Sequence, residues 1–572
     1  MRLCRLSVLT CLFLLAGCGG GGGDGGSGAA IVPPPSPSSC TDAGSTPPQA
    51  LAVTAPTLGS GFTAATSARF VGSGACAACH RTDTSLAPPV NVDASTGQPM
   101  GLANDWGGSL MAHAARDPYF VAVVSAESAL TPALATALQN KCLRCHAPMA
   151  SVEAEASGQT LELSGLSTSA LGQDGVSCAL CHRIEAAGLG TEASFSGGFV
   201  IGSETGTARR IYGPYPSVAT GPMSLQIGMT PVEGAHIRAS AMCATCHVLR
   251  TDALDPATGR PTGISFPEQM SYKEWLASSI PASASCQTCH VPESTSGARL
   301  SSIGPTRIQA PFGKHHFTGG NSYLLSILRA DRAGANSLGL PADLSQFDAA
   351  LARTDNLLSQ STARLRVEPC LAQDVLSVAV TVTNLTGHKF PTGYPSRRAW
   401  LHFKVTDANG RTVFESGATD ARGEIVGRGA TPAPHFDQID QPTQVQVYET
   451  VMADAANRPT MRLTYAAKYL KDNRLLPAGM NPATTDTETR PVGTSADPNF
   501  TGGSDRVSYR VSTTGYAAPF RIEVELLFQS IPPAWVALLG ETPLPATTRF
   551  VSMAASADPQ PRRIAAVSTS LR

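Results

Sequence analysis

The sequence is poor in aromatic residues and has no excess of charge of either sign. Aromatic residues make up 6% of the 572 residues and charged residues 15%, while 42 Lys and Arg face 43 Asp and Glu, for a net charge of −1. This balance argues against a nucleic-acid-binding protein, which would carry a basic excess or stripe. Walker, G-x-S-x-G and H-E-x-x-H patterns are also absent. The sequence therefore carries no signature of a P-loop NTPase, an α/β-hydrolase or a zinc protease.

Cysteine and histidine are what the sequence does have, with 15 Cys and 12 His. Ten of the cysteines form five C-x-x-C pairs, and a histidine directly follows each pair. The C-x-x-C-H pattern is typical of covalent c-type haem attachment, in which two thioether bonds hold the haem and the histidine binds its iron. Zinc is the alternative, but zinc sites do not require a histidine directly after each pair. We expect five haem c groups at Cys76-Cys79-His80, Cys142-Cys145-His146, Cys178-Cys181-His182, Cys243-Cys246-His247 and Cys286-Cys289-His290.

The first residues have the features of an export signal. Arg2 and Arg5 precede an apolar run over residues 6–17, which is too short to span a bilayer as a helix. The run ends in Leu-Ala-Gly-Cys18, which resembles a bacterial lipoprotein box. We expect a signal peptide at 1–17, lipidation of Cys18 and a flexible Gly/Pro-rich tether over 18–65. An ordinary signal peptide ending near a cysteine is the alternative.

The lipoprotein interpretation predicts where the protein resides. Gly19 follows Cys18, and this position lacks the Asp that marks inner-membrane retention in many Gram-negative bacteria. We therefore expect an outer membrane lipoprotein on the periplasmic or extracellular face. Once the signal peptide, the motifs and Cys18 are set aside, Cys40 and Cys370 remain, and an oxidising compartment would allow them to pair. The position of Cys40 in the expected tether argues against that disulfide.

The pattern of apolar residues changes along the chain. Residues 66–325 are rich in Gly, Ser, Thr and Pro with short helical patches, which predicts a loop-rich, mainly α multihaem domain. Residues 326–365 predict a helical connector. From Leu376 to Thr383 the apolar residues alternate, and Asn409-Gly410 predicts a hairpin turn. The expected fold is multidomain, with a C-terminal antiparallel β-sandwich over 366–555.

A haem iron in such a protein needs a second axial ligand unless it binds substrate. Seven histidines lie outside the motifs, enough to supply all five haems. We expect His316 to be a surface or supporting residue and His402 to be an ordinary strand residue. His388 lies in a Gly-flanked loop of the C-terminal half, so its use would join the two halves. The candidate distal ligands are His113, His236, His315, His388 and His435.

Several blocks of the sequence resemble a known family. The first motif, the block from Trp106 to His113 and Asp117-Pro118 resemble exported multihaem c-type cytochromes related to the nitrifier tetrahaem cytochrome. The resemblance implies that His113 is an axial ligand. Further blocks are similar to stretches in multihaem proteins of anaerobic and metal-respiring bacteria, so the resemblance implies haem binding and electron transfer in anaerobic respiration. These blocks are Phe266 to Trp275, His315 to Asn321, Gly387 to Gly393 and Lys471 to Arg474.

The sequence thus predicts an electron-transfer protein rather than an enzyme. We expect a pentahaem lipoprotein that relays electrons at the cell envelope through mostly bis-His haems. Its partners would be other redox proteins or cytochromes and, through the lipid anchor, the membrane, with no nucleic acid. The alternative is a multihaem reductase or oxidase of small nitrogen or sulfur species, with one haem open on its distal side. A third possibility is that the β-domain is an adhesion or docking module.

Overall fold

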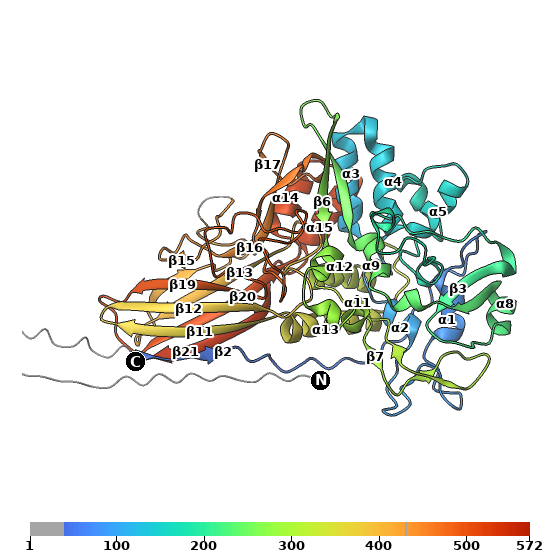
Figure 1. Ribbon diagram of the computed structural model, residues 1–572, viewed down its shortest axis with the longest axis horizontal. Helices are drawn as coiled ribbons and strands as arrows, with labels where there is room; N and C mark the ends of the chain where they lie inside the picture. The colour runs from blue at the N-terminus through green and yellow to red at the C-terminus, as the bar shows by residue number, and fades with distance from the viewer. Residues whose placement is uncertain (1–38, 429–431) are drawn as a thin grey trace, which may run out of the picture.

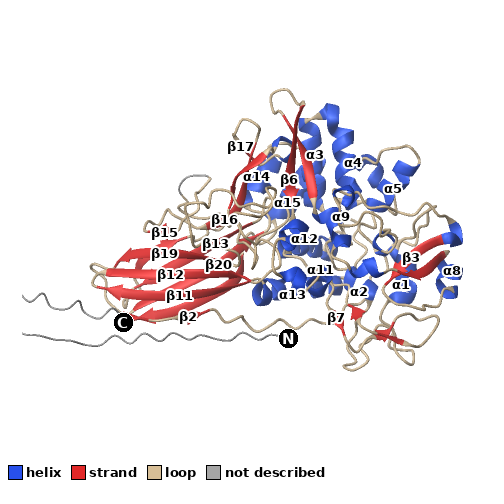
Figure 2. Cartoon of the chain, in the orientation of Figure 1, coloured by secondary structure: helices blue, strands red, loops and turns tan. Residues whose placement is uncertain are grey.

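The computed structural model describes residues 39–428 and 432–572. The expected signal peptide, the lipidation site Cys18 and the tether as far as residue 38 lie outside the described residues. Figure 1 shows short helices and loops of the motif-bearing half on the right and the long strands of the C-terminal half on the left, and Figure 2 shows the same division by secondary structure.

The motif-bearing half consists of short helices, connecting loops and small two-stranded sheets. The sheets pair β3 (Arg209–Gly213) with β4 (Met229–Glu233), β5 (Leu249–Leu254) with β6 (Pro261–Gln269), β7 (Glu293–Ser294) with β10 (Phe312–Gly313), and β8 (Ala298–Arg299) with β9 (Ile308–Gln309). The helices are α1 (Ser73–His80), α2 (Leu102–Trp106), α3 (Pro118–Leu130), α4 (Ala135–His146), α5 (Pro148–Ala156), α6 (Leu163–Leu166), α7 (Cys178–Cys181), α8 (Gly221–Ile227), α9 (Ala241–His247), α10 (Ser271–Leu276) and α11 (Cys286–His290).

Two helices, α12 (Ser322–Ala333) and α13 (Leu344–Ser361), connect the halves. Each begins at a polar residue whose side chain accepts backbone N–H groups of the first turn, Asn321 for α12 and Asp343 for α13. In α13 the Gln346 side chain reciprocates by accepting the Asp343 N–H, which completes a capping box. The same Gln346 donates to the carbonyl of Asn104 at 2.8 Å, so the start of α13 is fastened to α2.

The C-terminal half contains two larger sheets. A six-stranded sheet has the order β1-β11-β12-β19-β15, with β2 also paired to β11, and a seven-stranded sheet has the order β17-β16-β13-β20-β21, with β14 on β13 and β18 on β16. All these pairs are antiparallel except the short β15–β19 pair. The strands are β1 (Ser39–Cys40), β2 (Ala43–Gly44), β11 (Ala363–Ala372), β12 (Val375–Asn384), β13 (Arg398–Thr406), β14 (Thr412–Ser416), β15 (Gln438–Ile439), β16 (Val447–Ala453), β17 (Pro459–Thr460), β18 (Lys468–Asp472), β19 (Ser504–Ser512), β20 (Phe520–Gln529) and β21 (Arg562–Leu571).

The inner faces of the two sheets share one apolar core. In β12 the alternating residues Leu376, Val378, Val380 and Val382 are all buried in it. Opposite them, Phe403 of the second sheet stacks on Tyr509 of the first, with ring centroids 3.9 Å apart. The two sheets thus face each other with their apolar side chains between them.

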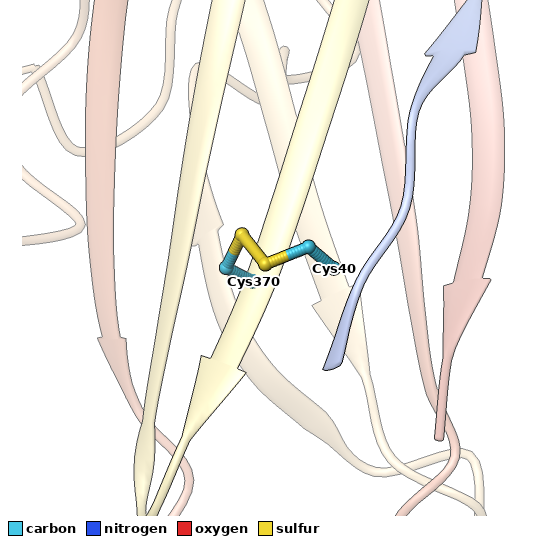
Figure 3. Close-up of a disulfide and its surroundings, with 2 residues drawn as sticks. All are labelled: Cys40 and Cys370. Carbon is cyan, nitrogen blue, oxygen red and sulfur yellow. A yellow bond between two sulfur atoms is a disulfide. The ribbon is translucent and has the colours of Figure 1, made fainter. Parts of the chain in front are cut away.

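The N-terminal segment differs from the tether expected over 18–65. Residues 39–44 supply β1 and β2 to the first sheet, and the segment that follows runs along α13, where Leu51 exchanges two hydrogen bonds with the Asn356 side chain. Cys40 faces Cys370 of β11 and the two form a disulfide (Figure 3). The argument from tether position against this disulfide is therefore wrong, because strand pairing holds Cys40 beside its partner.

The C-terminal end also extends past the expected boundary at 555. Strand β21 pairs with β20 and closes one edge of the seven-stranded sheet. Before it, α14 (Pro533–Gly540) and α15 (Pro545–Ala555) pack on α3 of the motif-bearing half, where Phe550 contacts Tyr119. The halves are thus joined through α3 as well as through α13.

Among residues 39–428 and 432–572 no single helix is long and apolar enough to cross a membrane. The helices Pro118–Leu130 and Pro132–His146, which are bent by 116° relative to each other, are together long and apolar enough, by length and composition alone.

Candidate functional site

Each of the five motifs lies at the end of a short helix. In α1, α4, α9 and α11 the motif histidine is the last helical residue, and in α7 the histidine, His182, is the C-terminal cap. A helical turn places residues three apart on the same face. Both cysteines of a C-x-x-C pair therefore face the same side, with the histidine next to the second one, as attachment of a single haem requires.

Cysteines of different motifs also contact one another. Contact with Cys76 and burial raise the pKa of Cys178 well above its usual range, so the first motif lies next to the third. Contact with Cys246 and burial raise the pKa of Cys145 well above its usual range, which joins the second motif to the fourth.

The fourth motif has two further neighbours. Contact with Cys286 of the fifth motif and burial raise the pKa of its Cys243 well above the usual range. Burial and the nearby Cys246 raise the pKa of Cys181 in the third motif to about 12. The fourth motif therefore lies close to the second, third and fifth motifs.

Four of the motif histidines are oriented in the same way. In each, Nδ1 donates to a backbone carbonyl, and this hydrogen bond leaves the Nε2 lone pair free for a metal ion. Burial lowers the pKa of His146 to about 4, so the imidazole is neutral, as metal binding requires. The pairs are His80 with Leu300 at 2.9 Å, His146 with Ala114 at 3.0 Å, His182 with Tyr212 at 2.5 Å and His290 with Thr318 at 2.7 Å.

His315 lies opposite the histidine of the third motif. The rings of His182 and His315 are parallel to within 6°, with centroids 6.2 Å apart. Two imidazoles bound through Nε2 to opposite sides of one metal ion at about 2 Å have ring centres about 6 Å apart. His315 also has Nδ1 next to a carbonyl, that of Gly313 at 2.9 Å. The residues present therefore fit a bis-His haem iron at the third motif.

His388 approaches the motif-bearing half from the C-terminal half. Its Nδ1 donates to the carbonyl of Lys389 at 2.9 Å, again leaving Nε2 free. Burial lowers the pKa of His388, and the nearby His290 imidazole lowers it further. There is little space for a side chain at Gly387, because a Cβ there would lie 3.2 Å from Trp275. The structure thus brings His388 near the fifth motif.

His113 and His236 use the other ring nitrogen for their backbone contact. Nε2 of His113 lies 2.9 Å from the carbonyl of Gly107, and its Nδ1 is buried without a partner. Nε2 of His236 lies 2.9 Å from the carbonyl of Ile184. Nδ1 is therefore the atom each offers to a metal ion.

Among the described residues, His435 forms no hydrogen bond with a motif residue. Both of its ring nitrogens form hydrogen bonds within the C-terminal half. Nδ1 accepts from the amides of Gln446 and Asn473 at 2.9 and 3.0 Å, and Nε2 lies 2.9 Å from Asp497. Both amide oxygens accept backbone N–H groups, which fixes the amide orientation. The proton of His435 is therefore on Nε2. This placement disfavours a haem ligand, and it also disfavours a metal site with Asp497 and Asp505, whose ligand atoms lie close by.

The two remaining histidines face carboxylates. Nε2 of His316 is 3.6 Å from buried Asp105, and Arg353 binds the other oxygen of that carboxylate at 2.6 Å. His402 lies between Glu415 and Glu525, each at 3.1 Å, on strand β13. Both positions agree with the supporting and strand roles expected for them.

Arg397 is a functional candidate that the sequence interpretation missed. It donates to the carbonyl of Thr392 at 2.7 Å, and it forms no ion pair with a carboxylate in the described parts of the chain. Burial lowers its pKa to about 10. Burial lowers the pKa of His247 to about 4, and the nearby His290 and the charge of Arg397 lower it further; the same charge also lowers the pKa of His388. The sequence could have pointed to Arg397, because this arginine follows the Gly387 to Gly393 block and is therefore close to His388 in the chain.

Comparison with solved structures gives a similar chain in the crystal structure of a penta-heme cytochrome c552 from Thermochromatium tepidum. The sequences are 18% identical, the match covers 75% of this chain and 83% of that chain, and the TM-score is 0.43. No protein-family model and no curated protein matches this chain. A functional conclusion therefore rests on the chain's own motifs and geometry.

Proposed function

We propose that this chain is a pentahaem c-type cytochrome that relays electrons at the cell envelope. The observation that carries the proposal is the pair His182 and His315, whose parallel rings have the spacing of two ligands on one iron. Haem with two histidine ligands supplies one-electron transfer and has no open position for substrate.

The chain's own residues hold and orient the groups. The ten motif cysteines provide the thioether bonds, and the motif histidines provide the proximal nitrogens. Backbone carbonyls such as Leu300 O and Thr318 O fix the ring orientation of these histidines and raise their basicity as ligands. His388 would serve the fifth motif across the boundary between the halves.

The contacts between motif cysteines support a branched relay. The first motif touches the third, the third approaches the fourth, and the fourth touches the second and fifth. Electrons entering at the first motif would therefore reach the fourth and leave through the second or the fifth. The acceptors would be other redox proteins or cytochromes.

One observation favours the alternative function. Four histidines outside the motifs offer a free ring nitrogen in a backbone-fixed orientation: His113, His236, His315 and His388. His435 has both nitrogens engaged, so a fifth haem would lack a distal histidine. An open haem of this kind could bind and reduce or oxidise a small nitrogen or sulfur species.

Low-temperature EPR of the oxidised protein tests both functions. We expect four low-spin haems and one high-spin haem. Five low-spin haems would support a pure electron carrier and remove the enzyme alternative. A spectrum dominated by high-spin haem would contradict the bis-His relay.

The proposed location follows from the sequence alone. The Leu-Ala-Gly-Cys18 box and the Gly/Pro-rich residues after it favour an outer membrane lipoprotein on the periplasmic or extracellular face. Export to an oxidising compartment agrees with the Cys40–Cys370 disulfide.

A further inference from the structure

Four charged side chains form a closed, buried cluster where the two halves meet. Lys389 Nζ is 2.6 Å from Asp472 Oδ2, and Arg474 binds both oxygens of Asp472 at 2.8 Å. Arg474 Nη1 also lies 3.0 Å from Glu274 Oε1. The four side chains are 8% exposed or less. Two cations and two carboxylates thus neutralise one another away from solvent.

The cluster joins three segments that are distant in sequence. Glu274 belongs to α10, between the fourth and fifth motifs, whereas Lys389 lies in the loop after β12 and Asp472 ends β18. Glu274 Oε2 also accepts the Lys389 backbone N–H at 3.2 Å and the Thr392 hydroxyl at 2.6 Å. The Glu274 carboxylate therefore holds the loop that directly follows His388 through two hydrogen bonds.

Lys389 couples this cluster to the orientation of the His388 ring. Its N–H is held by Glu274, its ammonium by Asp472, and its carbonyl accepts from His388 Nδ1. All three polar groups of Lys389 are thus fixed, and its carbonyl sets the direction of the His388 ring. The backbone of Gly387, the residue before His388, also approaches α10 and the segment after it, because a Cβ there would lie 3.2 Å from Trp275 and 3.3 Å from Ile280.

We propose that Lys389, Asp472, Arg474 and Glu274 are positioning residues for His388, and that they set the coordination and reduction potential of the haem it binds. A buried ion cluster is poor evidence for stability, because well-packed apolar residues are often as good. Fixing the direction of a ligand gives the cluster a role that apolar packing does not fill. This inference rests on the proposed function.

Lys389→Met tests the inference in the full-length holoprotein. We expect the low-spin EPR signal of one haem to broaden or convert to high-spin, and the midpoint potential of that haem to shift, with the other haems unchanged. The matched control is Lys404→Met, which removes a lysine from an ion pair with Glu415 at 3.2 Å on β13. A folded Lys389→Met protein with wild-type EPR and potentials overturns the inference.

Two further variants keep the test decisive. If Lys389→Met does not accumulate, the double variant Lys389→Met/Asp472→Asn removes one charge of each sign and leaves the Arg474–Glu274 pair; the same EPR and potential criteria apply. Glu274→Gln keeps an oxygen that can accept hydrogen bonds from the loop, so it should perturb the same haem less than Glu274→Ala. Equal effects of the two variants would contradict the role of the hydrogen bonds between Glu274 and the loop.

His388→Ala separates this inference from the proposed ligation. If His388→Ala converts one haem to high-spin while the cluster variants change nothing, only the positioning inference fails. If His388→Ala leaves the number of low-spin haems unchanged, the ligation fails and the inference fails with it.

Discussion

The imidazole rings of His182 and His315 are parallel to within 6° and have centroids 6.2 Å apart, although 133 positions separate them in the sequence. Each ring has Nδ1 next to a backbone carbonyl, that of Tyr212 for His182 and that of Gly313 for His315. These backbone contacts engage Nδ1 and leave Nε2 of both rings free to bind a metal ion.

His315→Ala should convert the haem of the third motif from low-spin to high-spin, because it removes one of two strong-field ligands. His316→Ala is the matched control, since its ring faces Asp105. Low-temperature EPR distinguishes the two variants. If His316→Ala loses a low-spin signal and His315→Ala does not, His316 is the ligand and the assignment of His315 is wrong.

Arg397→Gln should lower the reduction potential of one haem near His247 and His388. A buried cation without a carboxylate partner disfavours the more positive, oxidised iron, so its removal stabilises the oxidised form. A spectroelectrochemical titration measures the shift. Arg411→Gln, which removes a half-exposed arginine from a surface pair with Asp407, should leave all potentials unchanged. Equal titration curves for Arg397→Gln and wild type would show that Arg397 lies too far from any haem to act on it.

Replacing Cys40 and Cys370 together by Ala should destabilise the C-terminal half by about 2–5 kcal/mol. The disulfide closes a separation of 330 residues and holds β1 on β11. Thermal unfolding of the double variant measures the loss, and the haem spectra serve as the control because no motif cysteine is changed. An unchanged melting temperature would mean that strand pairing alone holds the N-terminal segment.

His402 should stabilise the fold in a pH-dependent way. Its hydrogen bonds with Glu525 and Glu415 raise its pKa, so the stabilisation is complete below the unfolded value of about 6.5 and disappears as pH rises through the raised value. The pKa values of both glutamates are lowered, so their share is lost as pH falls through those lowered values. Because His402 and the two glutamates are partly exposed, we expect their interaction to contribute less than about 1 kcal/mol to the free energy of unfolding. His402→Gln should lower the unfolding free energy near neutral pH and match wild type in alkali; a constant difference would contradict the assignment.

Cys18→Ser should release the protein from the membrane fraction and leave haem incorporation intact. The expectation comes from the Leu-Ala-Gly-Cys18 box, in which the cysteine carries the lipid. Fractionation with haem staining measures the outcome. A wild-type protein that is already soluble and begins at another cleavage site would show that the box is part of an ordinary signal peptide.

Local patterns predicted much of the structure. The alternation from Leu376 to Val382 gave a buried strand face, and each C-x-x-C-H motif lies at a helix end. Strand β21 was missed because its buried residues Ile564, Ala565 and Val567 do not alternate strictly. A register shift opposite Leu526 and Leu527 causes this irregularity, and it depends on the partner strand.

Long-range pairing could not be predicted in the same way. The pattern around His315 marked it as a ligand, but nothing local could connect it to His182. The order of the N-terminal segment comes from the hydrogen bonds of its backbone to β11 and α13, which are distant in sequence. His435 also has ligand-like neighbours in sequence, and only the amides of Gln446 and Asn473 show that its Nδ1 is occupied.

Covalent haem stoichiometry tests the central claim most directly. Intact mass spectrometry of the purified protein, combined with a pyridine haemochrome assay, counts the haems bound to the ten motif cysteines. The account predicts five covalent haems per chain. A mass that corresponds to three or fewer would contradict it.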